Sequence, residues 1–306
     1  MKKFTQVCLI TSLILILVGG TICVIGKFSG GWRQVDEIGE NGSWHKILSG
    51  IPNVYFGEYF ADFDDCWDIE ENGIEAENGY TKIEADAEDI TELKISIGGA
   101  ALYIKESEDR SFGVKKEGIG KYQYYESNGV LYLEGNKKNV IKNNEKIYLY
   151  IPAGMNFERV TIEVGGGLVE AGELNADVID VEAGAGMITS DKINCRSLTV
   201  DIGAGKATLK GIEAEEMDMS VGVGHVYTKG NITKKIEVDC EMGAVEMVLA
   251  GSEKDYNYEV NSEAGGITIG GRIYNSLVED TYIDNDAPRE CILDCAMGSI
   301  QLSFDK

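Results

Sequence analysis

Apolar and polar residues alternate through the second half of the chain, and the alternation repeats every 19 residues. The apolar positions form three columns: Val160, Ile179, Leu198, Met217 and Ile236; Ile162, Val181, Val200, Met219 and Val238; Val164, Ala183, Ile202, Val221 and Cys240. A period of two is typical of strands, and a fixed repeat of this length indicates a solenoid whose coils stack on one another. Because equivalent residues recur in the same chain direction, we expect parallel strands with coils about 4.8 Å apart.

Glycines mark the turns of this repeat. They follow one another by 19 residues: Gly167, Gly186, Gly205, Gly224 and Gly243. Inward positions resume after each turn at Val169, Ile188, Ala207, Val226 and Val245, and each coil is expected to close with a polar turn such as residues 174–177. We expect glycine for two reasons: a sharp turn calls for a positive φ, and a side chain would collide with the turn of the next coil. The pattern lacks the third glycine and the following helix of a nucleotide-binding loop.

The repeat continues less regularly on both sides. Upstream, residues 93–100 have the same strand and turn, and residues 123–135 predict a hairpin around Asn128-Gly129. Downstream, residues 260–269 predict one more coil, and residues 291–304 predict the last. Residues 272–288 between them are expected to be an inserted excursion. The predicted fold is an all-β, parallel β-solenoid that forms one domain over residues 80–306.

The N-terminal part predicts a membrane anchor. Residues 1–6 carry Lys2 and Lys3 and are expected in the cytoplasm, and the uncharged residues 7–26 are long enough to span a bilayer as one transmembrane helix. The lysines favour a cytoplasmic N-terminus, which would place the C-terminal domain outside the cell membrane. The alternative is a cleaved signal peptide, although its apolar region is usually only about 7–15 residues. The residues before Cys23 match a lipid-attachment site poorly.

Residues 27–79 form an aromatic and acidic segment that contains Trp32, Trp44 and Trp67. It is expected to be a linker and a cap over the first coil, because open solenoid ends need covering. Two alternatives stay open: a segment that binds a partner, and one that lies at the membrane interface with Trp32 as its anchor.

Charge narrows the choice of partners. The chain has 52 acidic and 28 basic residues and a formal net charge of −24, which excludes nucleic acid as a partner. Acidic residues form two outward columns: Glu163, Glu182, Asp201 and Asp239; Asp180, Asp218 and Glu237. We interpret them as a solvated face that opposes aggregation. A more specific hypothesis is that the carboxylates of Glu163, Glu182 and Asp201 bind calcium.

The spacing of the seven cysteines matches no recognisable disulfide framework. Cys8 and Cys23 lie in the expected span, and the other five are Cys66, Cys195, Cys240, Cys291 and Cys295. Cys240 and Cys295 share an inward column, but the coil with Ser262 is expected between them, so they should lie about 9.6 Å apart, beyond disulfide reach. We therefore expect buried thiols packed as small apolar side chains.

The sequence contains no recognisable catalytic constellation. The two histidines, His45 and His225, belong to no Ser-His-Asp set, and no nucleophile elbow or phosphate loop is present. With so few histidines a zinc site is not expected. We therefore predict a protein that is not an enzyme, with no catalytic, cofactor-binding or metal-binding residues.

The repeated strand-Gly-x-Gly-strand coil, the strand that ends in residues 151–154 and the closing residues 295–304 resemble a bacterial family of β-strand repeats usually labelled "putative adhesin". The resemblance covers about residues 93–304. It implies a β-solenoid, tethered to the membrane of Gram-positive bacteria, with a binding or envelope-sensing role, and it supplies no catalytic residues.

Two functional hypotheses follow. The leading one is a surface binding module, similar to an adhesin, whose ligand belongs to the cell wall, the host or the envelope. The alternative is an accessory or sensor of a cell-envelope stress response, in which the span or the aromatic segment contacts a membrane partner. A carbohydrate-active enzyme is disfavoured, because such β-helices generally need long loops and basic residues around a cleft.

Overall fold

The computed structural model describes residues 73–108, 110–135, 145–275 and 281–305. The chain divides into two compact units, Met1–Ile69 and Glu70–Lys306, and every described residue belongs to the second. The predicted membrane span and all three tryptophans therefore lie outside the described residues. Within the described ranges, no helix is both long and apolar enough to cross a bilayer.

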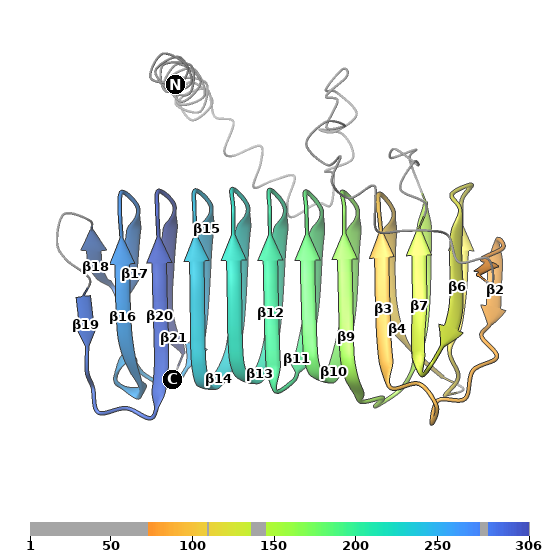
Figure 1. Ribbon diagram of the computed structural model, residues 1–306, viewed down its shortest axis with the longest axis horizontal. Coiled ribbons are helices and arrows are strands. Elements are labelled where there is room, and N and C mark those ends of the chain that lie inside the picture. Colours follow the sequence, from red (N-terminus) through yellow and green to blue (C-terminus); the bar gives the residue numbers. More distant parts are fainter. Residues whose placement is uncertain (1–72, 109, 136–144, 276–280, 306) are drawn as a thin grey trace, which may run out of the picture. The chain divides into compact units, whose positions relative to one another are not determined.

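The second unit is an all-β solenoid with two long faces (Figure 1). The first face contains, in stacking order, β7 (Val130–Gly135), β3 (Glu92–Ile97), β9 (Phe157–Val164), the second half of β10 (Leu168–Ala183), β12 (Ser197–Ile202), the second halves of β13 (Lys206–Val221) and β14 (His225–Cys240), β20 (Arg289–Cys295) and β16 (Tyr256–Ser262). The second face contains β8 (Lys146–Pro152), β4 (Ala101–Ser107), the first half of β10, β11 (Met187–Asn194), the first halves of β13 and β14, β15 (Ala244–Ala250), β21 (Ser299–Asp305) and β17 (Gly266–Ile269).

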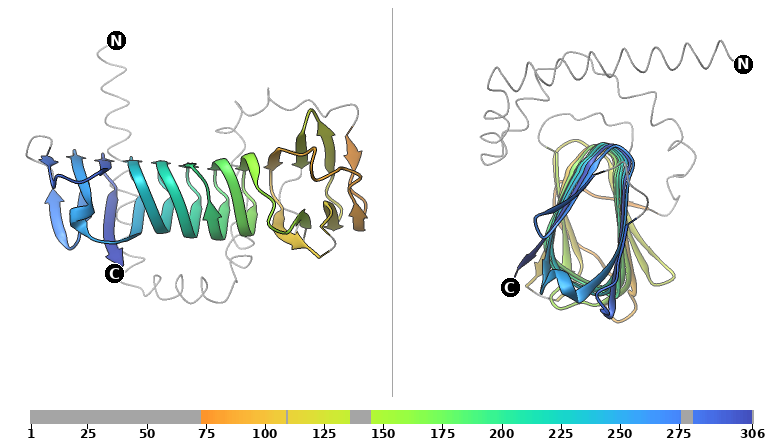
Figure 2. Two further views of the ribbon diagram at one scale, coloured as in Figure 1. Left: turned by 90° about the horizontal axis from the view of Figure 1, so that it is seen from below. Right: turned by 90° about the vertical axis from the view of Figure 1, so that its left-hand side faces the viewer.

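The two faces enclose one continuous apolar core, which the end-on view in Figure 2 shows as the interior of a flattened tube. Ile162, Val181 and Val200 are direct partners on consecutive parallel strands, and each is at most 3% exposed. The predicted 19-residue register is therefore confirmed. Side chains 19 residues apart pack against one another because parallel pairing places equivalent residues on neighbouring coils.

The turn glycines are explained by only one of the two expected reasons. None of the five turn glycines is among the glycines with a positive φ, so the prediction of a left-handed turn was wrong. A Cβ on Gly186 would lie 2.8 Å from the carbonyl oxygen of Gly167, and one on Gly224 would lie 2.6 Å from that of Gly205. Glycine is needed here because the backbones of successive turns approach too closely for any side chain.

The second corner of each coil is not the predicted polar turn. Residues 174–177 lie within β10, which continues as one strand of 16 residues from one face to the other. Leu174 and Ala176 are 2% and 3% exposed, so the inward alternation continues around the corner and the backbone stays paired. The strands β13 and β14 are continuous in the same way.

Near both ends of the solenoid the stacking order departs from the sequence order. The coil of β3 and β4 lies between β7 and β9 on one face and between β8 and β10 on the other. The coil of β20 and β21, which we call the last coil, lies between β14 and β16 and between β15 and β17. The last coil was expected beyond residues 260–269, and this expectation was wrong.

Antiparallel strands form both ends of the stack. At one end the predicted hairpin is present: β6 (Tyr122–Ser127) pairs with β7, and Asn128 and Gly129 have φ of 54° and 80°. The remaining strands there are β1 (Ile74–Glu75), β2 (Gly79–Lys82) and β5 (Gly113–Glu117). At the other end, the predicted excursion supplies β18 (Arg272–Asn275) and β19 (Thr281–Ile283), which pair antiparallel with β17 and β16.

Candidate functional site

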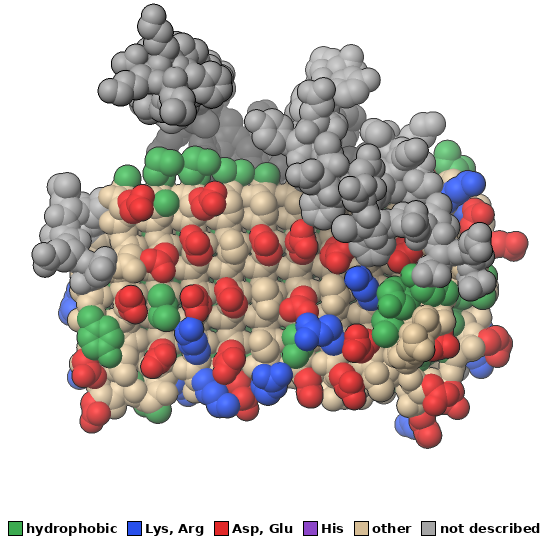
Figure 3. Space-filling view, in the orientation of Figure 1, with side chains coloured by type: hydrophobic (Ala, Val, Ile, Leu, Met, Phe, Trp, Pro, Cys, Tyr) green, Lys and Arg blue, Asp and Glu red, His purple; other side chains and the backbone are tan. Residues whose placement is uncertain are grey.

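The predicted acidic column lies on the outer side of the first face, where Figure 3 shows rows of acidic side chains. Glu182 is paired in register with Glu163 on one side and with Asp201 on the other. Burial, and then the charges of Glu163 and Asp201, raise the pKa of the Glu182 carboxyl. The column therefore repels itself, as like charges on neighbouring coils should.

The acidic side chains described on this face are not arranged as a cation-binding cluster. Among the described residues, no three His, Cys, Asp or Glu side chains are placed to hold a metal ion together. Cations of the chain itself partly neutralise the second column, since Arg159 pairs with Asp180 and Lys235 Nζ lies 2.6 Å from Glu237 Oε2. The geometry gives the calcium hypothesis no support, and we interpret the columns as a solvated face.

His225 also lacks a catalytic setting. Its Nε2 lies 3.6 Å from Glu246 Oε1, and its Nδ1 is buried without a hydrogen-bond partner. The thiols of Cys195, Cys240, Cys291 and Cys295 are free, and burial raises the pKa of each. Thiols of this kind are mainly protonated at neutral pH and are therefore poor nucleophiles.

A row of tyrosines and lysines, which the sequence pattern did not predict, lies on the outer side of the second face. Parallel pairing of β8 with β4 places Tyr148 beside Tyr103, and the two rings stack with centroids 5.0 Å apart. The row continues on β5 with Lys115, whose Nζ lies 5.1 Å from the Tyr148 centroid. Lys105 on β4 lies above both stacked rings, 5.8 Å from the Tyr103 centroid and 5.1 Å from that of Tyr148. These are cation–π distances, so the rings and ammonium groups hold one another in place.

A second aromatic pair extends this tyrosine row toward the end of the stack. The ring of Tyr80 on β2 meets that of Tyr150 on β8 edge-on at 5.6 Å. Gly113 on β5 makes room for Tyr80, because a Cβ there would lie 2.6 Å from the tyrosine hydroxyl oxygen. We call Tyr80, Tyr103, Tyr148 and Tyr150 the tyrosine row.

A depression of about 380 Å³ adjoins the tyrosine row on the side of β4 away from β8. It spans the outer side of β4, β10 and β11, and its lining includes Tyr103, Lys105, Glu170, Gly172, Thr189 and Asp191. A Cβ on Gly172 would meet nothing within 4 Å, and its φ is not positive. This glycine is thus not required by the backbone, and its missing side chain keeps the depression open.

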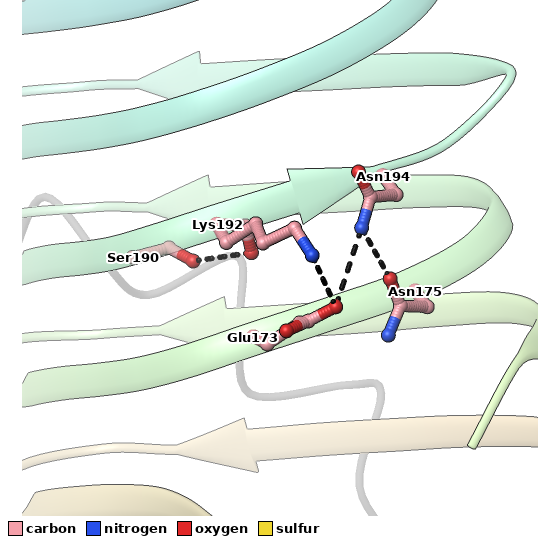
Figure 4. Close-up of polar contacts among 5 residues, drawn as sticks. All are labelled: Glu173, Asn175, Ser190, Lys192 and Asn194. Carbon is pink, nitrogen blue, oxygen red and sulfur yellow. Dashed lines mark hydrogen bonds and ion pairs between the residues drawn. The ribbon is translucent and has the colours of Figure 1, made fainter. Parts of the chain in front are cut away.

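A polar network at the corner of the coil supports one rim of the depression (Figure 4). Lys192 Nζ donates to Glu173 Oε1 at 2.8 Å, and Asn194 Nδ2 donates to Asn175 Oδ1 at 2.5 Å. Both contacts join β10 to β11 immediately beyond Gly172 and Asp191. The two strands that form the floor are thereby fixed relative to each other.

The depression combines hydrogen-bond donors and acceptors around one aromatic ring. Glu170 and Asp191 are exposed acceptors, and Lys105 is an exposed donor that forms no ion pair with a described residue. Burial, followed by the charge of Glu170, raises the pKa of Tyr103, so its hydroxyl stays protonated at neutral pH and can donate. An arrangement of this kind can bind a neutral, polar molecule without any metal ion.

The chain matches the sequence model of a known protein family. The model of the Toastrack DUF4097 family matches residues 90–269, which is more than half of the chain. The chain belongs to the Toastrack DUF4097 family. The resemblance predicted from the sequence is confirmed, and the matched part of this Toastrack chain includes all the residues that line the depression.

Several solved structures resemble this Toastrack solenoid. They include a "putative adhesin" of Bacteroides fragilis, with 13% identity and a TM-score of 0.42 over 76% of this chain and 97% of that chain. A "putative cell adhesion protein" of Clostridium sporogenes has 17% identity and a TM-score of 0.29 over 76% of this chain and 100% of that chain. A "putative adhesin" of Parabacteroides merdae has 16% identity, a TM-score of 0.38 and the same coverage. At these identities the likeness concerns the fold alone. No curated protein matches the chain.

Proposed function

We propose that this chain is a membrane-anchored binding module, similar to an adhesin, whose solenoid is displayed outside the cell. The anchor and the location rest on the apolar residues 7–26 and on the two lysines before them. The observation that carries the binding role is the open depression beside Tyr103, bordered by the tyrosine row. We assign ligand binding to this depression, and we expect no catalytic turnover there.

The chemistry of the depression favours a saccharide as ligand. A sugar presents hydroxyl groups that both donate and accept, and the carboxylates of Glu170 and Asp191 would accept while Lys105 would donate. The ring of Tyr103 offers a flat apolar surface on which the C–H face of a sugar can pack. Because its other side stacks on Tyr148, the ring is held ready before the ligand arrives, which lowers the entropic cost of binding.

The proposal is tested by screening the full-length protein in detergent against immobilised cell-wall and host glycans, with affinity measured by calorimetry. We expect at least one glycan to bind and the substitution Gly172→Leu to reduce its affinity at least tenfold, because the new side chain fills the depression. The fold should tolerate this change, since a Cβ at position 172 meets no neighbouring atom.

Gln301→Leu provides the matched control, because Gln301 is an exposed, neutral residue of β21 on the same outer face. This variant should bind as the unchanged protein does. Unchanged affinity in the Gly172→Leu variant would refute the assignment of the site. A screen without any glycan binding would refute the saccharide class, and turnover of a glycan would refute the non-enzymatic role.

A further inference from the structure

Two buried cysteines lie side by side where the last coil joins the main stack. Cys240 ends β14, Cys295 ends β20, and the two are direct partners in the parallel pairing of these strands. Both side chains point into the core, with 0% and 2% exposed. The Cys240 thiol donates a hydrogen bond to the backbone oxygen of Ser299 on the last coil, at 4.0 Å. The coil with Ser262 was expected between them, and this expectation was wrong, because the last coil pairs directly with β14.

The pairing of β14 with β20 brings the backbones of the two cysteines within disulfide distance. Directly paired residues on neighbouring parallel strands have Cα atoms about 4.8 Å apart, within the range of about 4.4–6.8 Å found in disulfides. A Cβ on Gly298 would lie 2.7 Å from Cys240 Sγ, so this sulfur leans toward the last coil, and a Cβ on Gly265 would lie 2.4 Å from Cys295 Sγ, so that sulfur leans toward the coil of β16. Rotation of the Cys295 side chain to another χ1 rotamer is needed to turn its sulfur toward Cys240. Cys291, by contrast, is paired in register with Ile236 and Tyr258 and has no cysteine as a partner among the described residues.

We propose that Cys240 and Cys295 form a disulfide that fastens the last coil to the main stack. The bond closes a loop containing β15 to β19, so it links strands that meet only when the last coil enters between β14 and β16. Such a cross-link stabilises the fold mainly by restricting the unfolded chain. It would hold in place a coil whose insertion the sequence order does not enforce.

The reaction is a thiol–disulfide exchange with a small disulfide such as oxidised glutathione. One cysteine, as its thiolate, attacks the oxidant to form a mixed disulfide and releases one glutathione thiol; the second cysteine then displaces the other. The chain loses two electrons and two protons, which pass to the two glutathione molecules. The exchange takes place during folding, because the finished core shields both sulfurs from solvent. In the cell it would rest on the proposed location outside the membrane, where such oxidants persist.

The test refolds the denatured, reduced full-length protein in detergent with a buffer of reduced and oxidised glutathione. Free thiols are then blocked, the protein is digested without reductant, and the peptides are identified by mass spectrometry. We expect a linked peptide that contains Cys240 and Cys295, and a melting temperature at least about 5 °C above that of protein refolded with reductant. Because this assay uses a purified protein and a chemical oxidant, its result does not depend on the ligand or on the cellular location.

The double substitution Cys240→Val and Cys295→Val should remove both the linked peptide and the effect of the oxidant on the melting temperature. Valine occupies the equivalent inward position in the preceding coil, at Val221. Cys195→Ser, in the coil formed by β11 and β12, should leave both results unchanged. If the two thiols of the unchanged protein stay free, or if the linked protein melts no higher than the reduced one, the proposal is overturned.

Discussion

At the scale of single residues, glycines have two different roles in this solenoid. The turn glycines are required because the next backbone occupies the space of a side chain, as at Gly224, where a Cβ would lie 2.6 Å from the oxygen of Gly205. Gly172 occupies open space, and its missing side chain shapes the depression instead. One residue type thus serves packing in one place and the candidate site in the other.

Substitution by alanine should separate these two roles. Gly224→Ala is expected to lower the free energy of unfolding by about 1–3 kcal/mol, because the turns of two coils must move apart. Gly172→Ala is expected to be neutral or to stabilise by about 0.4–1 kcal/mol through the unfolded chain. Urea denaturation of both variants measures the difference. Equal stabilities would contradict the steric explanation of the turn glycines.

Glu182 should make stability depend on pH. A carboxyl whose pKa is raised in the folded state favours folding at low pH, and this contribution is lost as the pH rises through the folded pKa. Glu182→Gln is therefore expected to raise the melting temperature at pH 7 and to have little effect near about pH 3.5.

At pH 7 the substitution Glu182→Gln should raise the free energy of unfolding by at most about 1 kcal/mol for each neighbouring carboxylate, and this increase should shrink in high salt. Glu259→Gln is the control, since Glu259 is exposed on β16 and paired in register with Ile292 and Tyr282 rather than with acids. A gain for Glu182→Gln that persists unchanged at low pH would show that charge repulsion is not its cause.

At the scale of secondary-structure elements, most strands and their register could be predicted, because apolar residues repeat with a fixed period and parallel pairing turns this period into contacts. The positions of the two coils that are out of sequence order could not be predicted. Coils of the same pattern fit one another equally well, so the pattern does not say which coil follows which. The tyrosine row was missed for the same reason: Tyr103 meets Tyr148 only because β4 pairs with β8 across an inserted hairpin.

The inserted position of the last coil predicts the effect of a truncation. A chain that ends at Pro288 loses Leu293, Ile300 and Leu302, each of which contributes about 1.5–3 kcal/mol by burial. We expect β16 and β17 to become sensitive to protease, because both lose their parallel neighbours, while β10 to β13 stay protected. If the last coil were only a cap at the end of the stack, β16 and β17 would remain protected after its removal.

At the scale of the whole solenoid, the faces differ in chemistry. Acidic columns, the first of which repels itself, lie on the outer side of the first face, whereas the tyrosine row and the depression lie on the second. The two features share one apolar core, so the proposed site on the second face is preformed, while the charge of the first face opposes aggregation. Both the depression and the paired thiols depend on the stacking order of the coils.

Methyl–methyl nuclear Overhauser effects in protein with labelled Ile, Leu and Val test this stacking order most directly. The structure predicts cross-peaks from Val169 to Leu102 and to Ile188, and from Leu293 to Val238 and to Val260. It predicts none between Val238 and Val260, which are two coils, about 9.6 Å, apart. A direct cross-peak between Val238 and Val260, with none to Leu293, would contradict the account.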